Sequence, residues 1–151
     1  MAVSDRLREL DITLPGVPAP AGAYLPAVRS GSLVFTAGQL PFVDGTLAAT
    51  GKVGAEVSVD DAGRLARLCG LNALAAVDAL VGIDSVVGVV KVTGFVASAP
   101  GFSQQPAVLD GASNFMGEVF GVEGAHARSA VGVAELPRGA PVEVEIVVEV
   151  G

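Results

Sequence analysis

Two helix-forming segments alternate with valine-rich strand segments, and this order limits the fold more than any other feature of the sequence. Apolar residues recur at helical spacing from Ala62 to Leu80, and Ser58, just before them, is a residue type that favours a helix N-cap. A second stripe of the same spacing predicts a helix over about 106–120. Two helices among five or six strands predict an α+β fold, in which a mixed β-sheet carries both helices on one face.

Valine-rich runs bounded by turn residues predict strands at 24–28, 32–37, 86–97, 127–134 and 142–146. A turn at 29–31 joins the first two, and the loop around 45–51 has room for another short strand. If the last two strands form a simple hairpin around Gly139, Arg128 and Glu143 are separated by about seven residues, roughly 23 Å. They would then share a ligand only if one chain supplied the arginine and its neighbour the glutamate.

The face of the sheet opposite the helices has no cover within one chain. Hydrophobic residues make up 51% of the sequence and charged residues 17%, so valine-rich strands leave little polar surface for a solvated face. We expect this face to be buried between subunits, most simply by three sheets packed around an axis, which predicts a homotrimer. High alanine and valine content inherited from a GC-rich genome is the alternative explanation.

Charge and cysteine usage exclude several classes of partner. The formal net charge is −7 with nine Lys and Arg residues, which provides no basic surface for nucleic acid. A single cysteine, Cys69, excludes an internal disulfide and fits a reducing cytoplasm. His126 is the only histidine and lies far from Cys69 in sequence, so no metal site is expected. No apolar run reaches the roughly 18 residues that span a bilayer, so we expect a cytoplasmic protein without a membrane partner.

A length of 151 residues predicts a single domain over 1–151. We interpret residues 1–20 as an N-terminal arm laid over this domain. The arm begins with a short helix over 4–10, and Pro15, Pro18 and Pro20 then impose an extended path.

Charged side chains open the last two strands of this charge-poor chain. Arg128 stands at the start of one strand, and Glu143 and Glu145 at the start of the other. Arginine binds a carboxylate through two parallel hydrogen bonds, and a nearby glutamate can hold or activate a water. The pair therefore indicates hydrolysis of a small carboxylic acid. We expect only one of the two glutamates to face the cleft and treat Glu145 as structural.

These residues also have structural interpretations. Arg128 could be a strand-end arginine paired with Glu143, Glu145 or Asp110, and Glu143 could be a solvated edge residue. Tyr24, the only tyrosine, could be a buried ring with a bonded hydroxyl.

Five segments over about residues 20–150 carry a resemblance to a known family. They are Gly22-Ala23-Tyr24 with Pro26-Ala27-Val28, Val34-Phe35-Thr36-Ala37-Gly38-Gln39-Leu40-Pro41, Asn72-Ala73-Leu74-Ala75-Ala76, Val90-Lys91-Val92-Thr93-Gly94-Phe95-Val96, and Ala127-Arg128-Ser129 through Leu136-Pro137 to Val142-Glu143-Val144-Glu145. Together they resemble the RidA (YjgF) family, the reactive-intermediate imine deaminases once called L-PSP endoribonucleases. Gly111-Ala112-Ser113 and the run from His126 to Gly132 resemble a less characterised branch of it.

The resemblance implies a chorismate-mutase-like fold and a homotrimer with clefts between subunits. It also implies hydrolysis of 2-imino acids or their enamines to 2-keto acids and ammonia, without a cofactor. Arg128 falls where the family binds the substrate carboxylate, and Glu143 where it positions the attacking water. Tyr24 matches a tyrosine that lines the cleft, and the positions of Gly38 and Ala130 match backbone that faces the substrate.

The sequence departs from the family pattern at two of these places. Ala37 stands where many members have serine, and Ala130 where many have cysteine, so the substrate range and the deaminase activity itself come into question. His126 stands near a position where a bulky apolar residue or proline is usual, and it could add a polar contact or be a loop or interface residue.

The leading function is therefore hydrolytic deamination of small imino or enamine acids. The runner-up is a metabolite-binding trimer with a regulatory role that keeps the carboxylate contact without turnover. A ribonuclease, as the older family name suggests, fits poorly with the acidic composition.

Overall fold

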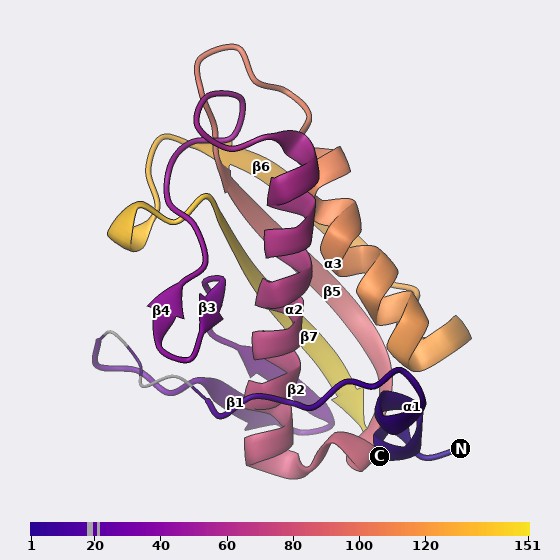
Figure 1. Ribbon diagram of the computed structural model, residues 1–151. Coiled ribbons are helices and arrows are strands. Elements are labelled where there is room, and N and C mark those ends of the chain that lie inside the picture. The colour runs from indigo at the N-terminus through magenta and orange to yellow at the C-terminus, as the bar shows by residue number, and fades with distance from the viewer. Residues whose placement is uncertain (18–19, 21) are drawn as a thin grey trace.

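A five-stranded sheet and two long helices form the two layers of the structure, a computed structural model that describes residues 1–17, 20 and 22–151 (Figure 1). The strands, in the order in which they lie across the sheet, are β1 (Ala27–Ser30), β2 (Leu33–Thr36), β7 (Val142–Val150), β5 (Val86–Ala97) and β6 (Ala127–Val133). The helices α2 (Val59–Val81) and α3 (Gln105–Phe120) lie side by side on one face. The α+β fold with a mixed sheet is confirmed.

The last two strands do not form the simple hairpin considered as one possibility, because β5 lies between them. β6 runs parallel to β5, with α3 as the crossover, whereas β7 runs antiparallel to β5 on its other side. The turn around η3 (Pro137–Gly139) therefore carries the chain past β5 instead of folding β7 back onto β6. Any strand has a hydrogen-bonding edge on each side and can therefore pair with two neighbours, and local sequence does not say which neighbours it takes.

The two long helices follow their sequence signals. The backbone N–H of Asp61 donates to the Ser58 hydroxyl over 3.1 Å, which caps α2 at the predicted residue. Gly82 ends α2 with a positive φ of 80°. The short helix η1 (Ile83–Ser85) then leads into β5.

The first hairpin begins later than predicted. β1 starts at Ala27, so Tyr24 lies in the bend before the strand, and the Ala37 N–H donates to the Pro26 carbonyl beyond the end of β2. Its turn is a two-residue Gly31-Ser32 loop, because Ser30 pairs directly with Leu33 and Gly31 has a φ of 61°. The expected extra strand is present as a small hairpin of β3 (Phe42–Val43) and β4 (Thr46–Leu47).

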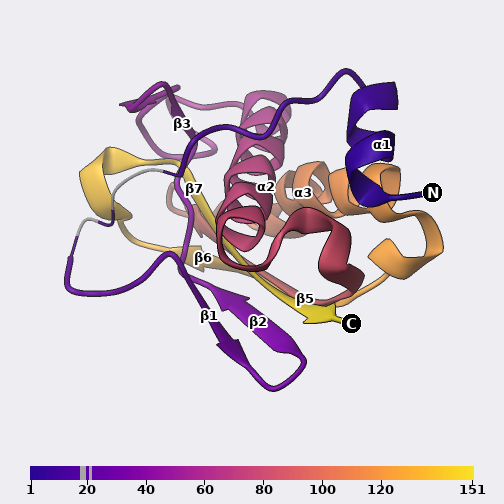
Figure 2. The same cartoon turned by 90° about the horizontal axis from the view of Figure 1, so that it is seen from below.

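The N-terminal arm contains α1 (Val3–Glu9), close to the predicted helix. Ser4 attaches α1 to the body, since its N–H and its hydroxyl both donate to the Asp84 carboxylate over 2.7 Å. The chain then passes without regular structure across α2, where Pro15 lines a hollow together with Leu68 (Figure 2). Pro18, one of the three prolines expected to extend this arm, lies outside the described residues.

The sheet face turned away from the helices is uncovered in the single chain, as predicted (Figure 2). Along β5, Val92 is fully buried under the helices, whereas Thr93 and Phe95 alternate onto the other side. Large apolar side chains remain exposed on this open face, among them Val28 (51%), Phe35 (44%) and Val131 (45%). In the part of the chain that the structure describes, no helix combines the length and hydrophobicity needed to cross a bilayer.

Candidate functional site

Glu143 is a half-buried carboxylate on the open face of the sheet. It stands near the beginning of β7 and pairs with Phe95 of β5. Burial raises the pKa of Glu143 above its usual value, and the carboxylate of Glu145 raises it further. A carboxylate that holds its proton more tightly than usual is a stronger base once ionised, which suits it to accept a proton from water.

Gly38 provides the space that Glu143 occupies. After β2 the chain bends back to β7, where Gln39 and Val144 exchange two backbone hydrogen bonds of 2.8 and 3.0 Å. This bridge fixes Gly38 directly against the glutamate, and a Cβ atom at position 38 would lie 2.7 Å from its Cδ. Two of the predicted site residues, Gly38 and Glu143, are thus in contact, with Ala37 next to them in the chain.

Glu145 shares the face of Glu143, so the expectation that only one of them faces this side is wrong. Residues two apart on a strand point to the same side of the sheet, and Val144 between them is fully buried. The pKa of Glu143 reflects this closeness, because a second negative charge disfavours its ionisation.

Arg128 lies on the other side of the sheet, against α3. Its Nη1 donates to Asp110 over 2.8 Å and to the Ser113 hydroxyl over 3.1 Å, and its Nη2 donates to the Pro106 carbonyl over 3.2 Å. Of the three acidic partners considered for a structural arginine, Asp110 is the one that pairs with it. Three of the five guanidinium N–H groups are used in these contacts, which leaves two for a ligand.

Arg128 and Glu143 do not converge within one chain. Arg128 pairs with Val92 and Glu143 with Phe95, so their positions along β5 differ by three residues, about 10 Å, and their side chains point to opposite faces. The sheet separates them by two further strand spacings, again about 10 Å. A small ligand therefore cannot touch both groups of the same chain.

Two further predicted site residues are Ala130 and Tyr24. Ala130 follows Arg128 on the same side of β6, opposite Gly94. Tyr24 is half exposed in the bend before β1, where its ring lies within 3.2 Å of the position a Cβ on Gly22 would occupy. A fully buried tyrosine ring is therefore excluded, and the cleft-lining role stays a prediction.

Sequence patterns did not place Ser113 and His126 together beside Arg128. Ser113 follows Asp110 by one helical turn on α3, and its hydroxyl lies 2.9 Å from Nε2 of His126. The spacing of three residues between Asp110 and Ser113 on the predicted helix could have indicated that their side chains share one face. That this face meets the arginine strand depends on how the helix packs.

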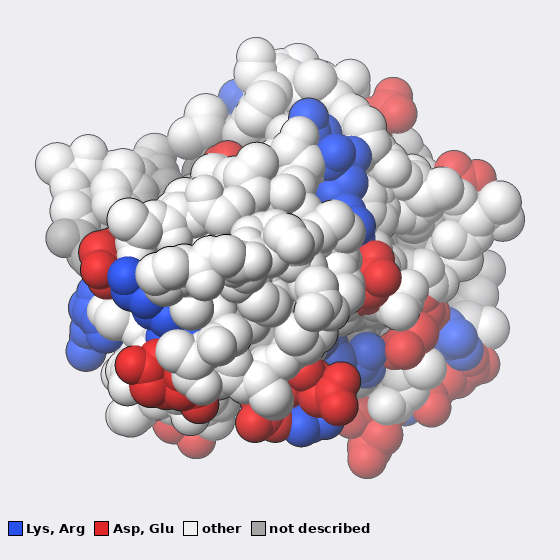
Figure 3. All heavy atoms as spheres, turned by 90° about the horizontal axis from the view of Figure 1, so that it is seen from above, with Lys and Arg blue, Asp and Glu red and all other residues white. Residues whose placement is uncertain are grey.

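Charge is dispersed over the face of the molecule that is seen from above (Figure 3). The face in Figure 3 has basic and acidic groups scattered among large uncharged areas, with no broad basic surface. Among the described residues, no cluster of three or more His, Cys, Asp or Glu side chains is arranged to hold a metal ion.

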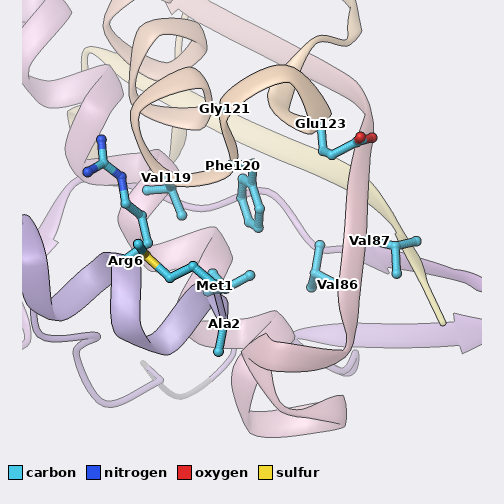
Figure 4. Close-up of a pocket in the computed structure, with 10 residues that line it drawn as sticks. Met1, Ala2, Arg6, Val86, Val87, Val119, Phe120, Gly121 and Glu123 are labelled. Carbon is cyan, nitrogen blue, oxygen red and sulfur yellow. The ribbon is translucent and has the colours of Figure 1, made fainter.

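The hollow shown in Figure 4 lies away from all of these residues. It has a volume of about 330 Å³ and lies between α1, the end of α3 and the start of β5. Apolar side chains such as Val86, Val119 and Phe120 line most of it, with Arg6 and Glu123 at its edges. None of the predicted site residues contributes to it.

Comparisons with known proteins agree with this architecture. The family model described as endoribonuclease L-PSP matches residues 16–150. Protein TCP17 of Trypanosoma cruzi is 44% identical over 149 residues, which cover 97% of this chain and 93% of that protein. The crystal structure of Atu1372 from Agrobacterium tumefaciens, a protein of unknown function, has a TM-score of 0.90 at 44% identity and covers 99% of this chain and 92% of that one.

A more distant structure connects the chain to the family name inferred from its motifs. The YjgF gene product of Escherichia coli has a TM-score of 0.67 at 28% identity, with 89% of this chain and 93% of that one covered. The five motif segments, the mixed sheet with its two helices and the match over residues 16–150 therefore have one explanation: the chain belongs to the endoribonuclease L-PSP family, also known as the RidA/YjgF family.

Proposed function

We propose that the protein hydrolyses small 2-imino acids, or their enamine tautomers, to 2-keto acids and ammonia without a cofactor. The observation that carries the proposal is the half-buried Glu143 carboxylate, which has a raised pKa and lies against Gly38 on the uncovered sheet face. In the reaction, the oxygen of water bonds to the imine carbon while Glu143 accepts a proton from the water and passes it to the imine nitrogen, which gives a carbinolamine. Glu143 then transfers the proton of the new hydroxyl group to the amino group, the carbonyl of the keto acid forms, and the C–N bond breaks to release ammonia.

The reacting groups come from two copies of the chain in this proposal. The exposed apolar side chains of the open face give neighbouring copies a reason to pack together, and we propose that they form a homotrimer with a cleft at each interface. Arg128 of one copy would hold the substrate carboxylate through its two remaining N–H groups, while Glu143 of the next directs water. The opposite orientation of the two side chains within one chain supports this division.

Ammonia release from enzymatically generated 2-iminobutyrate tests the activity. The wild-type protein is expected to accelerate release over the spontaneous reaction, Glu143→Ala to lose the acceleration, and Arg128→Ala to show at least about a tenfold higher KM. Wild-type protein that does not exceed the spontaneous rate would exclude the proposal.

A second function, carboxylate binding without turnover, is favoured by Ala37 and Ala130, which stand where many members of the family have serine and cysteine. In either function an incoming carboxylate must compete with Asp110, which already pairs with Arg128. Binding of 2-oxobutyrate that requires Arg128, combined with no ammonia release, would identify the protein as a binding trimer. Cleavage of RNA by the wild type and not by Glu143→Ala would instead support the activity in the family's older name.

A further inference from the structure

A chain of hydrogen bonds connects Arg128 to the only histidine of the sequence. Nδ1 of His126 lies 2.6 Å from the carbonyl oxygen of Gly124, and its Nε2 lies 2.9 Å from the Ser113 hydroxyl. The same hydroxyl accepts a hydrogen bond of 3.1 Å from Nη1 of Arg128. Ser113 therefore lies between the imidazole and the guanidinium and contacts both.

The carbonyl of Gly124 decides where the imidazole carries its proton. A carbonyl only accepts, so Nδ1 must be the protonated nitrogen, and Nε2 of the neutral ring is left as an acceptor. The Ser113 hydroxyl then gives its one hydrogen to Nε2 and offers only lone pairs to Arg128. In this state the serine has no hydrogen available for a ligand beside the guanidinium.

Protonation of His126 reverses the hydrogen bond between the ring and the serine. Nε2 then carries a hydrogen and donates to the Ser113 oxygen, whose own hydrogen is released. An anion next to Arg128 gains a hydroxyl donor and a second positive charge within the same cluster. Both changes favour a bound carboxylate over an empty site.

We propose that His126 is a positioning residue that acts through Ser113 on the carboxylate site of Arg128, so that carboxylates bind more tightly when the imidazole is protonated. The inference rests on the proposed function, since it assumes that Arg128 receives the ligand.

Few other charged groups face this cluster. The elements packed against β6 and the short helix η2 (Gly121–Gly124) are α3 and β5. The helix α3 contributes Asp110, which is paired with Arg128, and Glu118, which is paired with Arg67, and η2 itself contributes Glu123. Lys91 of β5 pairs with Ala127 and therefore lies on the other side of the sheet from Arg128.

The affinity for 2-oxobutyrate, measured by calorimetry between pH 5.5 and pH 8, tests the inference. We expect the wild-type protein to bind about fivefold or more tightly at pH 5.5 than at pH 8, and His126→Gln to lose most of this difference. The pH dependence that survives in His126→Gln measures the contribution of Glu143, whose protonation also favours an anion. Glu123→Gln changes a nearby charge without touching the hydrogen-bond chain, so it should keep the wild-type pH dependence.

Nuclear magnetic resonance of the single imidazole provides a test that needs no variant. Its ring nitrogens are expected to report the Nδ1–H tautomer at pH 8, and saturating 2-oxobutyrate should move the midpoint of its titration to higher pH, because coupling between two binding events is reciprocal. Ser113→Ala should reduce the change that the ligand causes in this titration midpoint.

The outcomes separate this inference from the proposed function. Binding that needs Arg128 but has the same pH dependence in the wild type and His126→Gln, or an imidazole midpoint unmoved by ligand, overturns the role of His126 alone. Binding that persists unchanged in Arg128→Ala overturns the carboxylate site itself.

Discussion

A Cβ atom placed on Gly38 would lie 2.5 Å from Oε1 of Glu143, so the carboxylate occupies the space that any other residue at position 38 would need. The backbone of Gly38 does not have a positive φ, so it can accommodate alanine. Only the contact between the new Cβ atom and Glu143 disfavours the substitution.

Gly38→Ala is therefore expected to move the Glu143 carboxylate while the chain still folds. Turnover of 2-iminobutyrate should fall about tenfold or more, because small displacements of a catalytic group are costly. Gly117→Ala is the matched control: a Cβ there meets no other atom within 4 Å, and alanine should slightly stabilise α3. Steady-state kinetics measure the turnover of both variants, and thermal melts check that both are folded. Unchanged turnover in Gly38→Ala would contradict the placement of Glu143.

Glu143→Gln is expected to increase stability and to reduce activity. The pKa of Glu143 is higher in the folded chain than its usual value of 4.5, so the folded state binds more protons and the free energy of unfolding falls as the pH rises through that interval. Glutamine cannot ionise, and the variant should therefore unfold at higher denaturant concentration at pH 7. Its turnover should fall about a hundredfold. A variant that is less stable than the wild type at pH 7 would show that Glu143 makes favourable contacts.

The acid limb of the pH–rate profile should report the same carboxylate. Glu143 acts as a base only when ionised, so turnover is expected to decline on the acid side with a midpoint above 4.5. The profile of kcat is the measurement, because it describes the enzyme with substrate bound. A midpoint at or below 4.5 would assign the acid limb to another group.

Asp110→Asn is expected to release Arg128 for its ligand. The aspartate side chain is 59% exposed, and exposed ion pairs contribute less than about 1 kcal/mol, so stability should change little. The affinity for 2-oxobutyrate should rise about two- to fivefold, because the neutral amide competes less for the guanidinium. Calorimetry with wild type and variant checks this, and weaker binding in Asp110→Asn would mean that the aspartate orients Arg128 instead of competing with the ligand.

Val131→Glu should disrupt the assembly proposed for the open sheet face. Val131 is 45% exposed on that face, and burying a charge there without a partner is strongly unfavourable. Light scattering after gel filtration should show a trimer for the wild type and a smaller species for the variant. Val122→Glu is the control, because Val122 is 89% exposed on η2 and away from the sheet. A monomeric wild-type protein would remove the basis for clefts between chains.

Gly111→Ala tests the packing that positions α3. A Cβ at position 111 would fall onto the carbonyl oxygen of Gly63 on α2, and neither backbone can yield easily. Overpacking of this kind costs about 1–3 kcal/mol, so the midpoint of chemical denaturation should fall clearly below that of the wild type. Gly117→Ala again provides the comparison on the same helix, and a Gly111→Ala variant as stable as the wild type would contradict the close approach of α2 and α3.

The main helices and strands could be predicted from the amino-acid sequence, because helix and strand periodicities and caps are local properties. The apolar spacing from Ala62 onwards and the cap at Ser58 placed α2, and the valine-rich run over 86–97 placed β5 with its full length. The motif segments also determined the family, which the comparison over residues 16–150 confirms.

The neighbours of each strand, and the side chains that share a face, became known from the three-dimensional fold. β5 separates β6 from β7, so Arg128 turns to α3 and Glu143 to the open side, although both stand at the start of a strand in the sequence. The cluster of Asp110, Ser113, His126 and Arg128 likewise exists only because α3 crosses beside β6. Strand pairing and helix packing join residues that are far apart in the chain, and their energies depend on non-local burial that no local pattern specifies.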